Sequence, residues 1–200
     1  MAKSKAPKRS VQASAQAPAN AANAPLRYAA IAIVGLAIAG GFWWLVSGGE
    51  QFRQLARDGA PALERMTTEP SLGREHLSPG ATYAYPSRFP TSGPHDPNWV
   101  KAGFYAAPQP PTQIVHALEH GNIVIYYDKP KTAALDTMKD WAVRFSGQWD
   151  GVVVVPMAGL GERVVLTAWT RRLELDQFEP ASAAAFVDAF RGRGPENPVR

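Results

Sequence analysis

The sequence predicts an α+β protein: a single N-terminal transmembrane helix followed by one small α+β domain with a loop-rich N-terminal half. Three observations support this prediction. Residues 28–46 contain no charged side chain, and prolines concentrate between residues 70 and 111. The regular elements expected after residue 121 follow the order strand, helix, strand, strand, helix. Strands and helices that do not strictly alternate indicate an α+β rather than an α/β fold.

The composition describes one domain with appendages and excludes several classes of function. Of the 200 residues, 46% are hydrophobic and 19% are charged, and none is cysteine. The absence of cysteine excludes disulfides, thiolate zinc sites, iron–sulfur clusters and cysteine nucleophiles. Residues 1–49 carry five Lys/Arg and no acid, whereas residues 50–200 carry sixteen Lys/Arg and seventeen Asp/Glu. Because the body of the chain is nearly neutral, we expect no nucleic acid among its partners.

The N-terminal quarter predicts a membrane anchor. Residues 1–27 are rich in Ala, Pro, Ser and Gln, and we expect a disordered, basic cytoplasmic tail there. Residues 28–47 are expected to form the transmembrane helix, because nineteen uncharged residues in helical conformation span about 28 Å, close to the hydrocarbon thickness. Basic residues precede this segment and the first acid follows it, which predicts a cytoplasmic N-terminus and an extracytoplasmic domain.

Four residues are expected at the two membrane interfaces: Arg27, Tyr28, Trp43 and Trp44. A cleaved signal peptide is the alternative interpretation of this segment. The apolar part of a signal peptide is usually about 7–15 residues long and is followed by small residues at a cleavage site. The segment here is longer, and Val46-Ser47-Gly48-Gly49 is a poor cleavage site. These features favour the uncleaved anchor.

After the anchor, we expect residues 48–70 to form a short helical stalk and residues 71–197 to form the domain. Strands are expected in the β-branched and apolar segments 122–127, 151–155 and 163–175. Helices are expected over residues 131–145, with Thr132 as N-cap, and over residues 183–191, followed by Gly192 in the left-handed conformation. Gly159-Leu160-Gly161 is expected to join two of the strands as a hairpin.

All four histidines lie within 45 residues of the loop-rich half: His76, His95, His116 and His120. Histidine is the commonest protein ligand for metals, so we expect these four to bind a metal ion. Glu119 and Asp96 lie next to histidines in the sequence and are expected to orient the ligands by hydrogen bonds. Trp99 and Trp149, both in expected loops, are candidates to line a pocket.

The conformation of the segment His116-Ala117-Leu118-Glu119-His120 determines whether its two histidines can bind the same ion. On a helix, residues four apart have Cβ atoms about 6 Å apart, whereas on a strand they are about 13 Å apart. A shared ion therefore requires a helical turn that ends at Gly121, with Leu118 facing the core. The segment also matches the inverted zinc-protease motif. We expect no protease activity, because a β-branched run follows Gly121 immediately.

Several motifs together resemble a known family. They include Ser92-Gly93-Pro94-His95, Val115-His116-Ala117-Leu118-Glu119-His120-Gly121, Thr167-Ala168-Trp169 and Gly194-Pro195-Glu196. In this combination the chain resembles the bacterial domain-of-unknown-function family 3105 over about residues 70–197. The resemblance implies an exported, often membrane-tethered domain without an assigned activity, and it implies that the four histidines belong to the family's pattern. It also places the protein in the bacterial inner membrane, with its domain in the periplasm.

The expected function is therefore that of an anchored, extracytoplasmic, non-enzymatic protein with a histidine-rich metal site. In the absence of cysteine, imidazole ligands favour copper or zinc. Met138 and Met157 would be further ligands for copper, although Met138 also fits a helix core position. Two alternatives stay open: an accessory or structural subunit of a larger membrane protein complex, and a small hydrolase that uses a bound metal with Glu119 as base.

Overall fold

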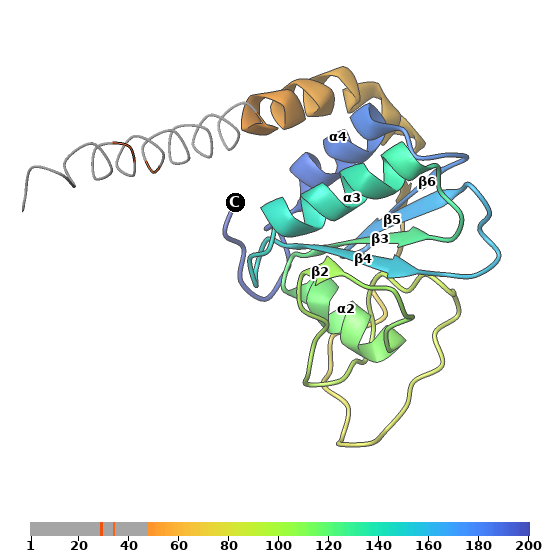
Figure 1. Ribbon diagram of the computed structural model, residues 1–200. Helices are drawn as coiled ribbons and strands as arrows, with labels where there is room; N and C mark the ends of the chain where they lie inside the picture. Colours follow the sequence, from red (N-terminus) through yellow and green to blue (C-terminus); the bar gives the residue numbers. More distant parts are fainter. Residues whose placement is uncertain (1–28, 30–33, 35–47) are drawn as a thin grey trace, which may run out of the picture. The chain divides into compact units, whose positions relative to one another are not determined.

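A six-stranded mixed sheet organises the domain in the computed structural model, which describes residues 48–200 together with Ala29 and Val34 (Figure 1). The strands lie in the spatial order β1-β6-β5-β3-β4-β2. Their bounds are β1 Thr67–Thr68, β2 Gly103–Phe104, β3 Ile123–Tyr127, β4 Val152–Pro156, β5 Val164–Ala168 and β6 Arg171–Leu175. The pairs β2–β4 and β3–β4 are parallel, and the pairs β3–β5, β5–β6 and β1–β6 are antiparallel.

The helices divide between the two faces of this sheet. Their bounds are η1 Ala60–Arg65, α2 Pro111–Glu119, α3 Thr132–Arg144 and α4 Pro180–Phe190. Helices α3 and α4 cover one face, and α2 lies on the other together with the long loops that precede it (Figure 1). This arrangement confirms the α+β class of the domain.

The central strands are apolar throughout because both of their faces are buried. In β3, Ile123 and Ile125 pack on the side of α3 and α4, whereas Val124 and Tyr126 pack on the side of α2. The valines of β4 alternate in the same way. The strands expected over 122–127 and 151–155 are thereby confirmed, and two separate cores lie on the two sides of one sheet.

Helix boundaries differ from the sequence prediction by one to three residues, and α4 begins at Pro180 rather than at residue 183. Helix α3 begins at Thr132 itself, and Lys131 occupies the N-cap position without a side-chain cap. The expectation that Thr132 is the N-cap was therefore wrong by one residue. Helix α4 ends at Phe190, and Gly192 follows with φ +75°, which confirms its expected left-handed conformation.

The segment 163–175 is a hairpin rather than one strand. Strands β5 and β6 pair in antiparallel register around Trp169 and Thr170. Thr170 has φ +57°, a conformation that is rare for a β-branched residue. Hairpin turns with positive φ usually contain Gly or Asn, and because this turn contains neither, the sequence did not predict it. The hairpin expected at Gly159–Gly161 is also absent, because β3 lies between β4 and β5 in the sheet.

Residues 48–70, which we expected to form a stalk, pack onto the domain. Residues 48–58 are helical, and η1 follows after Gly59. Phe52 is buried, with its ring 5.3 Å from Trp141 and 4.8 Å from Phe145 between centroids. Strand β1 then pairs with β6 at the edge of the sheet. Gly48–Arg200 is accordingly one structural unit.

The predicted tail and membrane anchor, including Arg27, Tyr28, Trp43 and Trp44, lie outside the described residues apart from Ala29 and Val34. Among the residues that are described, no helix combines the length and the apolar character needed to cross a membrane. The membrane anchor therefore remains a prediction from the sequence.

Candidate metal centre

Two segments of the loop-rich half meet side by side at His76 and His95. The backbone of Leu77 donates to the carbonyl of His95 at 2.7 Å, and the backbone of His95 donates to the carbonyl of Glu75 at 3.0 Å. These bonds form an isolated parallel bridge between His76 and His95. The bridge brings both side chains to the same side of the two paired segments, although His95 follows His76 by nineteen positions in the sequence.

Helix α2 supplies His116 and Glu119 from its last turn, and His120 follows as its C-cap residue. Pro111 begins the helix, where its missing N–H costs nothing, and Gly121 with φ +95° ends it. Leu118 is fully buried between α2 and the sheet. The helical turn expected over residues 116–120 is thus confirmed, as is the inward direction of Leu118.

Three imidazoles from these segments converge. The ring centroids of His76, His95 and His116 are 4.9–5.0 Å apart in every pairing. Each of these histidines and Glu119 offers a ligand atom, and the four atoms all lie within 4.8 Å of one another. His95, His116 and Glu119 are buried and His76 is exposed. The structure therefore brings together a set of three nitrogens and one oxygen that can hold a metal ion.

Backbone carbonyls fix the tautomers of two of these histidines. His95 Nδ1 lies 2.8 Å from the carbonyl oxygen of Gly93, and His116 Nδ1 lies 2.7 Å from that of Asp96. A carbonyl oxygen only accepts, so each Nδ1 must carry the hydrogen. In the neutral ring the lone pair then belongs to Nε2, which is free to bind a metal.

His95 and Glu119 face each other through two acceptor atoms. His95 Nε2 lies 3.0 Å from Glu119 Oε2. His95 is completely buried, and its Nε2 has no hydrogen-bond partner among the described residues. Two buried acceptors that face each other at this distance are costly, and a cation between them, whether a proton or a metal ion, would remove that cost.

Burial shifts the pKa values of this cluster toward the neutral forms. Burial lowers the pKa of His95 and that of His116, and neighbouring histidines lower them further. Burial also raises the pKa of Glu119, and the nearby Glu196 carboxylate adds to this effect. Neutral imidazoles are the form that binds metals, so the environment prepares the histidines for this role.

A second, smaller group adjoins the first. His116, His120 and Glu196 offer ligand atoms within 4.8 Å of one another. His120 Nε2 lies 3.0 Å from Glu196 Oε2, and His116 Nε2 lies 3.8 Å from the same oxygen. Burial, followed by the influence of His116, lowers the pKa of His120 to about 4. Of the four expected ligands, His120 is thus the one that lies outside the three-histidine group.

The indole rings of Trp99 and Trp149 flank His120, with centroids at 4.6 and 4.2 Å. Both tryptophans were expected to line a pocket, and they instead enclose this histidine. Glu196 was not among the residues chosen from the sequence as candidates. It lies near the C-terminus, and only the resemblance of Gly194-Pro195-Glu196 to a family motif drew attention to its surroundings.

The remaining expected residues have other places. Asp96 orients His116 through its main-chain carbonyl, whereas its carboxylate accepts from the backbone of Asn98 at 2.7 Å. Met138 is fully buried in the core on the opposite side of the sheet, and Met157 packs against the core on the α2 side.

Comparison with known proteins gives one match. A family model described as "Protein of unknown function (DUF3105)" matches residues 76–200. The chain belongs to the DUF3105 family. The match confirms the resemblance found in the sequence, and it includes every residue of the two groups that could hold a metal ion. No curated protein and no solved structure matches the chain.

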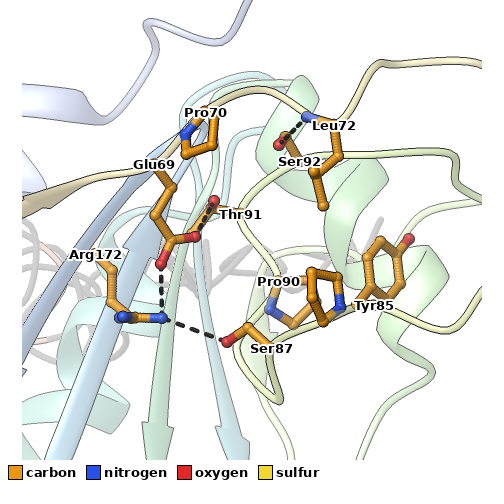
Figure 2. A pocket seen from close by; sticks show the side chains of 10 residues that line it. Glu69, Pro70, Leu72, Tyr85, Ser87, Pro90, Thr91, Ser92 and Arg172 are labelled. Carbon is orange, nitrogen blue, oxygen red and sulfur yellow. Dashed lines mark hydrogen bonds and ion pairs between the residues drawn. The ribbon is translucent and has the colours of Figure 1, made fainter.

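The DUF3105 domain also contains a cavity of about 390 Å³ between its long loops and β6 (Figure 2). Glu69 accepts hydrogen bonds from Thr91 at 2.7 Å and forms an ion pair with Arg172 at 2.6 Å in its wall. The charged groups of the cavity are therefore paired with each other, and none of its lining residues belongs to the histidine groups. The histidine cluster is the better candidate for the functional site.

Proposed function

We propose that this protein is a membrane-anchored, extracytoplasmic metal-binding protein that holds one copper or zinc ion through His76, His95, His116 and Glu119. The observation that supports the proposal is the convergence of these four side chains, with ligand atoms within 4.8 Å of one another. The role is binding rather than catalysis. Glu119 acts as a ligand and not, as we expected from the sequence, only as a group that orients one.

The side chains fit such an ion chemically. Around a tetrahedral zinc ion with bonds near 2.1 Å, ligand atoms are separated by about 3.3 Å, and His95 Nε2 lies 3.0 Å from Glu119 Oε2. A bound divalent ion would supply the positive charge that these two facing acceptors lack. The carbonyls of Gly93 and Asp96 hold the two buried imidazoles in the tautomer that such binding needs.

The donor set narrows the choice of metal. Three imidazoles and one carboxylate suit zinc or divalent copper, whereas monovalent copper prefers sulfur ligands. Met138 lies in the core on the side of the sheet opposite to α2, and Met157 packs against the core on the α2 side, so these positions give no support to a monovalent copper site. Elemental analysis of the purified protein distinguishes a zinc site from a divalent copper site.

The extracytoplasmic location is supported by the sequence alone. Residues 28–46 are uncharged, five basic residues precede residue 50, and no acid does. This distribution supports a domain on the side of the membrane opposite to the basic tail. An exported domain encounters metal ions outside the cytoplasm and needs ligands that do not oxidise, and imidazole meets that need.

Elemental analysis of the full-length chain tests the metal site. The chain is purified in detergent with a tag that contains no histidine, dialysed against a weak chelator and measured beside His95→Gln and Glu162→Gln. Glu162 is an exposed carboxylate that pairs with Lys131, so its variant is the matched control. We expect about one zinc or copper per chain in the wild type and the control, and less than a tenth of that in His95→Gln. Absence of metal from the wild type after reconstitution with both ions would refute the proposal.

The cavity in Figure 2 favours a second candidate function, that of an accessory subunit in a larger membrane complex. Pro70, Pro86, Pro90 and Tyr85 give it apolar walls, and Leu72 at its rim is 40% exposed. Leu72→Glu should then reduce the size of the complex that native gels of solubilised membranes reveal, while metal content stays unchanged. An identical complex size in wild type and variant would remove this candidate.

A further inference from the structure

His116 belongs to both metal-binding groups. The first group is His76, His95, His116 and Glu119, which we call the inner position. The second is His116, His120 and Glu196, which we call the outer position. The rings of His116 and His120 lie 4.6 Å apart between centroids, so the two positions are neighbours.

The two positions exclude each other. His116 Nδ1 donates to the carbonyl of Asp96, which leaves Nε2 as its one nitrogen with a lone pair. A single lone pair binds a single ion. When an ion at the inner position takes His116, the outer position keeps only His120 and Glu196, which is too few protein ligands for a tight zinc or copper site.

The outer position is the more accessible to an incoming cation. The side chain of Glu196 is 40% exposed, whereas that of Glu119 is 6% exposed and that of His95 is completely buried. His76 is also exposed, but an imidazole carries no negative charge and therefore attracts a hydrated cation less than a carboxylate does. An ion that approaches from solvent therefore meets the charge of Glu196 first.

The C-terminal segment holds Glu196 against the end of α2. The backbone of Gly192 donates to the carbonyl of Gly121 at 2.9 Å, and that of Glu196 donates to the carbonyl of Glu119 at 3.3 Å. Gly194 packs so closely that a Cβ there would lie 2.1 Å from the carbonyl oxygen of Glu119. The position of Glu196 is thus built into the backbone and does not depend on its side chain alone.

We propose that the metal site works as a two-position relay: the outer position captures a divalent transition-metal ion from a donor, and the ion then moves to the inner position. This inference rests on the proposed metal-binding function and identifies the ion as exchangeable cargo. His116 stays bound during the move, while His120 and Glu196 are replaced by His76, His95 and Glu119. One carboxylate binds the ion in each position, so the charge around the ion is the same before and after the move. A proton held between His95 Nε2 and Glu119 is displaced when the ion arrives, and Glu196, which the ion leaves, can accept it.

Zinc is the probe that tests the relay. The full-length chain in detergent is freed of metal and mixed with the zinc complex of a coloured pyridylazo-resorcinol chelator, and the loss of colour gives the rate of transfer to the protein. We compare the wild type with Glu196→Gln and with the matched control Glu162→Gln. Since Glu196 is exposed, its substitution by Gln should leave the fold intact, which circular dichroism checks.

The relay predicts that Glu196→Gln slows the transfer at least tenfold while the final content stays at one zinc per chain. It also predicts that His95→Gln retains a weak zinc site that His120→Gln removes in the double variant. Two zinc ions bound per wild-type chain, or an unchanged transfer rate in Glu196→Gln, would overturn the relay and leave the inner site standing. A wild type that binds no zinc would instead refute the metal site itself.

Discussion

Glu119→Gln is predicted to have opposite effects on the metal-free and the metal-loaded protein. Without metal, His95 Nε2 and Glu119 Oε2 are buried acceptors 3.0 Å apart. The amide that replaces the carboxylate can donate a hydrogen to His95 Nε2 and thereby satisfy it. With metal, the same substitution removes the one anionic ligand of the inner position.

The magnitude follows from the cost of an unsatisfied buried acceptor, which is about 1–3 kcal/mol. We expect Glu119→Gln to raise the unfolding free energy of the metal-free protein by up to this amount at pH 8, where the lowered pKa of His95 leaves its ring neutral. For a domain of this size, each kcal/mol shifts Tm by about 2–4 °C. In the presence of zinc, a hundredfold loss of affinity would lower the stabilisation by about 2.7 kcal/mol.

Scanning calorimetry in a strong chelator and in excess zinc measures both effects on the same samples. Glu162→Gln serves again as the control and should match the wild type in both conditions. If Glu119→Gln destabilises the metal-free protein by more than about 1 kcal/mol, our reasoning fails. The carboxylate would then be held by a protonated His95 or another donor and would not oppose a bare lone pair.

Further predictions concern the pH dependence, the helix, the C-terminal segment and the anchor. Because burial lowers the pKa of His120 to about 4, the unfolded chain binds a proton that the metal-free folded state does not between pH 6.5 and pH 4. Stability should therefore fall with acidification through this window by up to about 1.4 kcal/mol per pH unit for this group, and His120→Gln should reduce that slope in urea titrations. Leu118→Ala should lower the free energy of unfolding, measured with denaturant, by about 2–5 kcal/mol. It should also weaken zinc binding, because Leu118 packs the helical turn that carries the ligands against the core. Gly194→Ala should slow zinc transfer as much as Glu196→Gln does, because its Cβ would meet the backbone of α2; an unchanged transfer rate would argue against the fixed C-terminal segment. Deletion of residues 1–47 should move the protein from the membrane fraction to the soluble fraction, and continued sedimentation with membranes would contradict the predicted anchor.

The central elements of the fold were predictable because local patterns decide them. The apolar runs of β3 and β4 are buried on both faces of the sheet, and α3 shows helical periodicity. The hairpin around Thr170 was missed since a β-branched residue with φ +57° occupies a turn where Gly or Asn is usual. The packing of Phe52 on Trp141 was missed because it joins segments far apart in sequence.

The candidate site was predictable in part for a similar reason. His116 and His120 lie one helical turn apart, and this spacing predicted that both can reach one ion, as they do in the group with Glu196. His76 and His95 were identified by residue type, but their meeting depends on a backbone bridge between loops that no periodicity reveals. Glu196 reaches His120 only because the chain after α4 returns to the end of α2, and a lone carboxylate near a terminus gives no sequence signal of that return.

X-ray absorption spectroscopy of the metal-loaded, full-length chain tests the inner position most directly. We predict about three imidazole nitrogens and one oxygen at roughly 2.0–2.1 Å from zinc, with one imidazole lost in His76→Gln. His76 is exposed on a loop, so this variant should fold normally. A spectrum with fewer than two imidazoles, or one unchanged in His76→Gln, would contradict the assignment of His76, His95, His116 and Glu119 as the metal ligands.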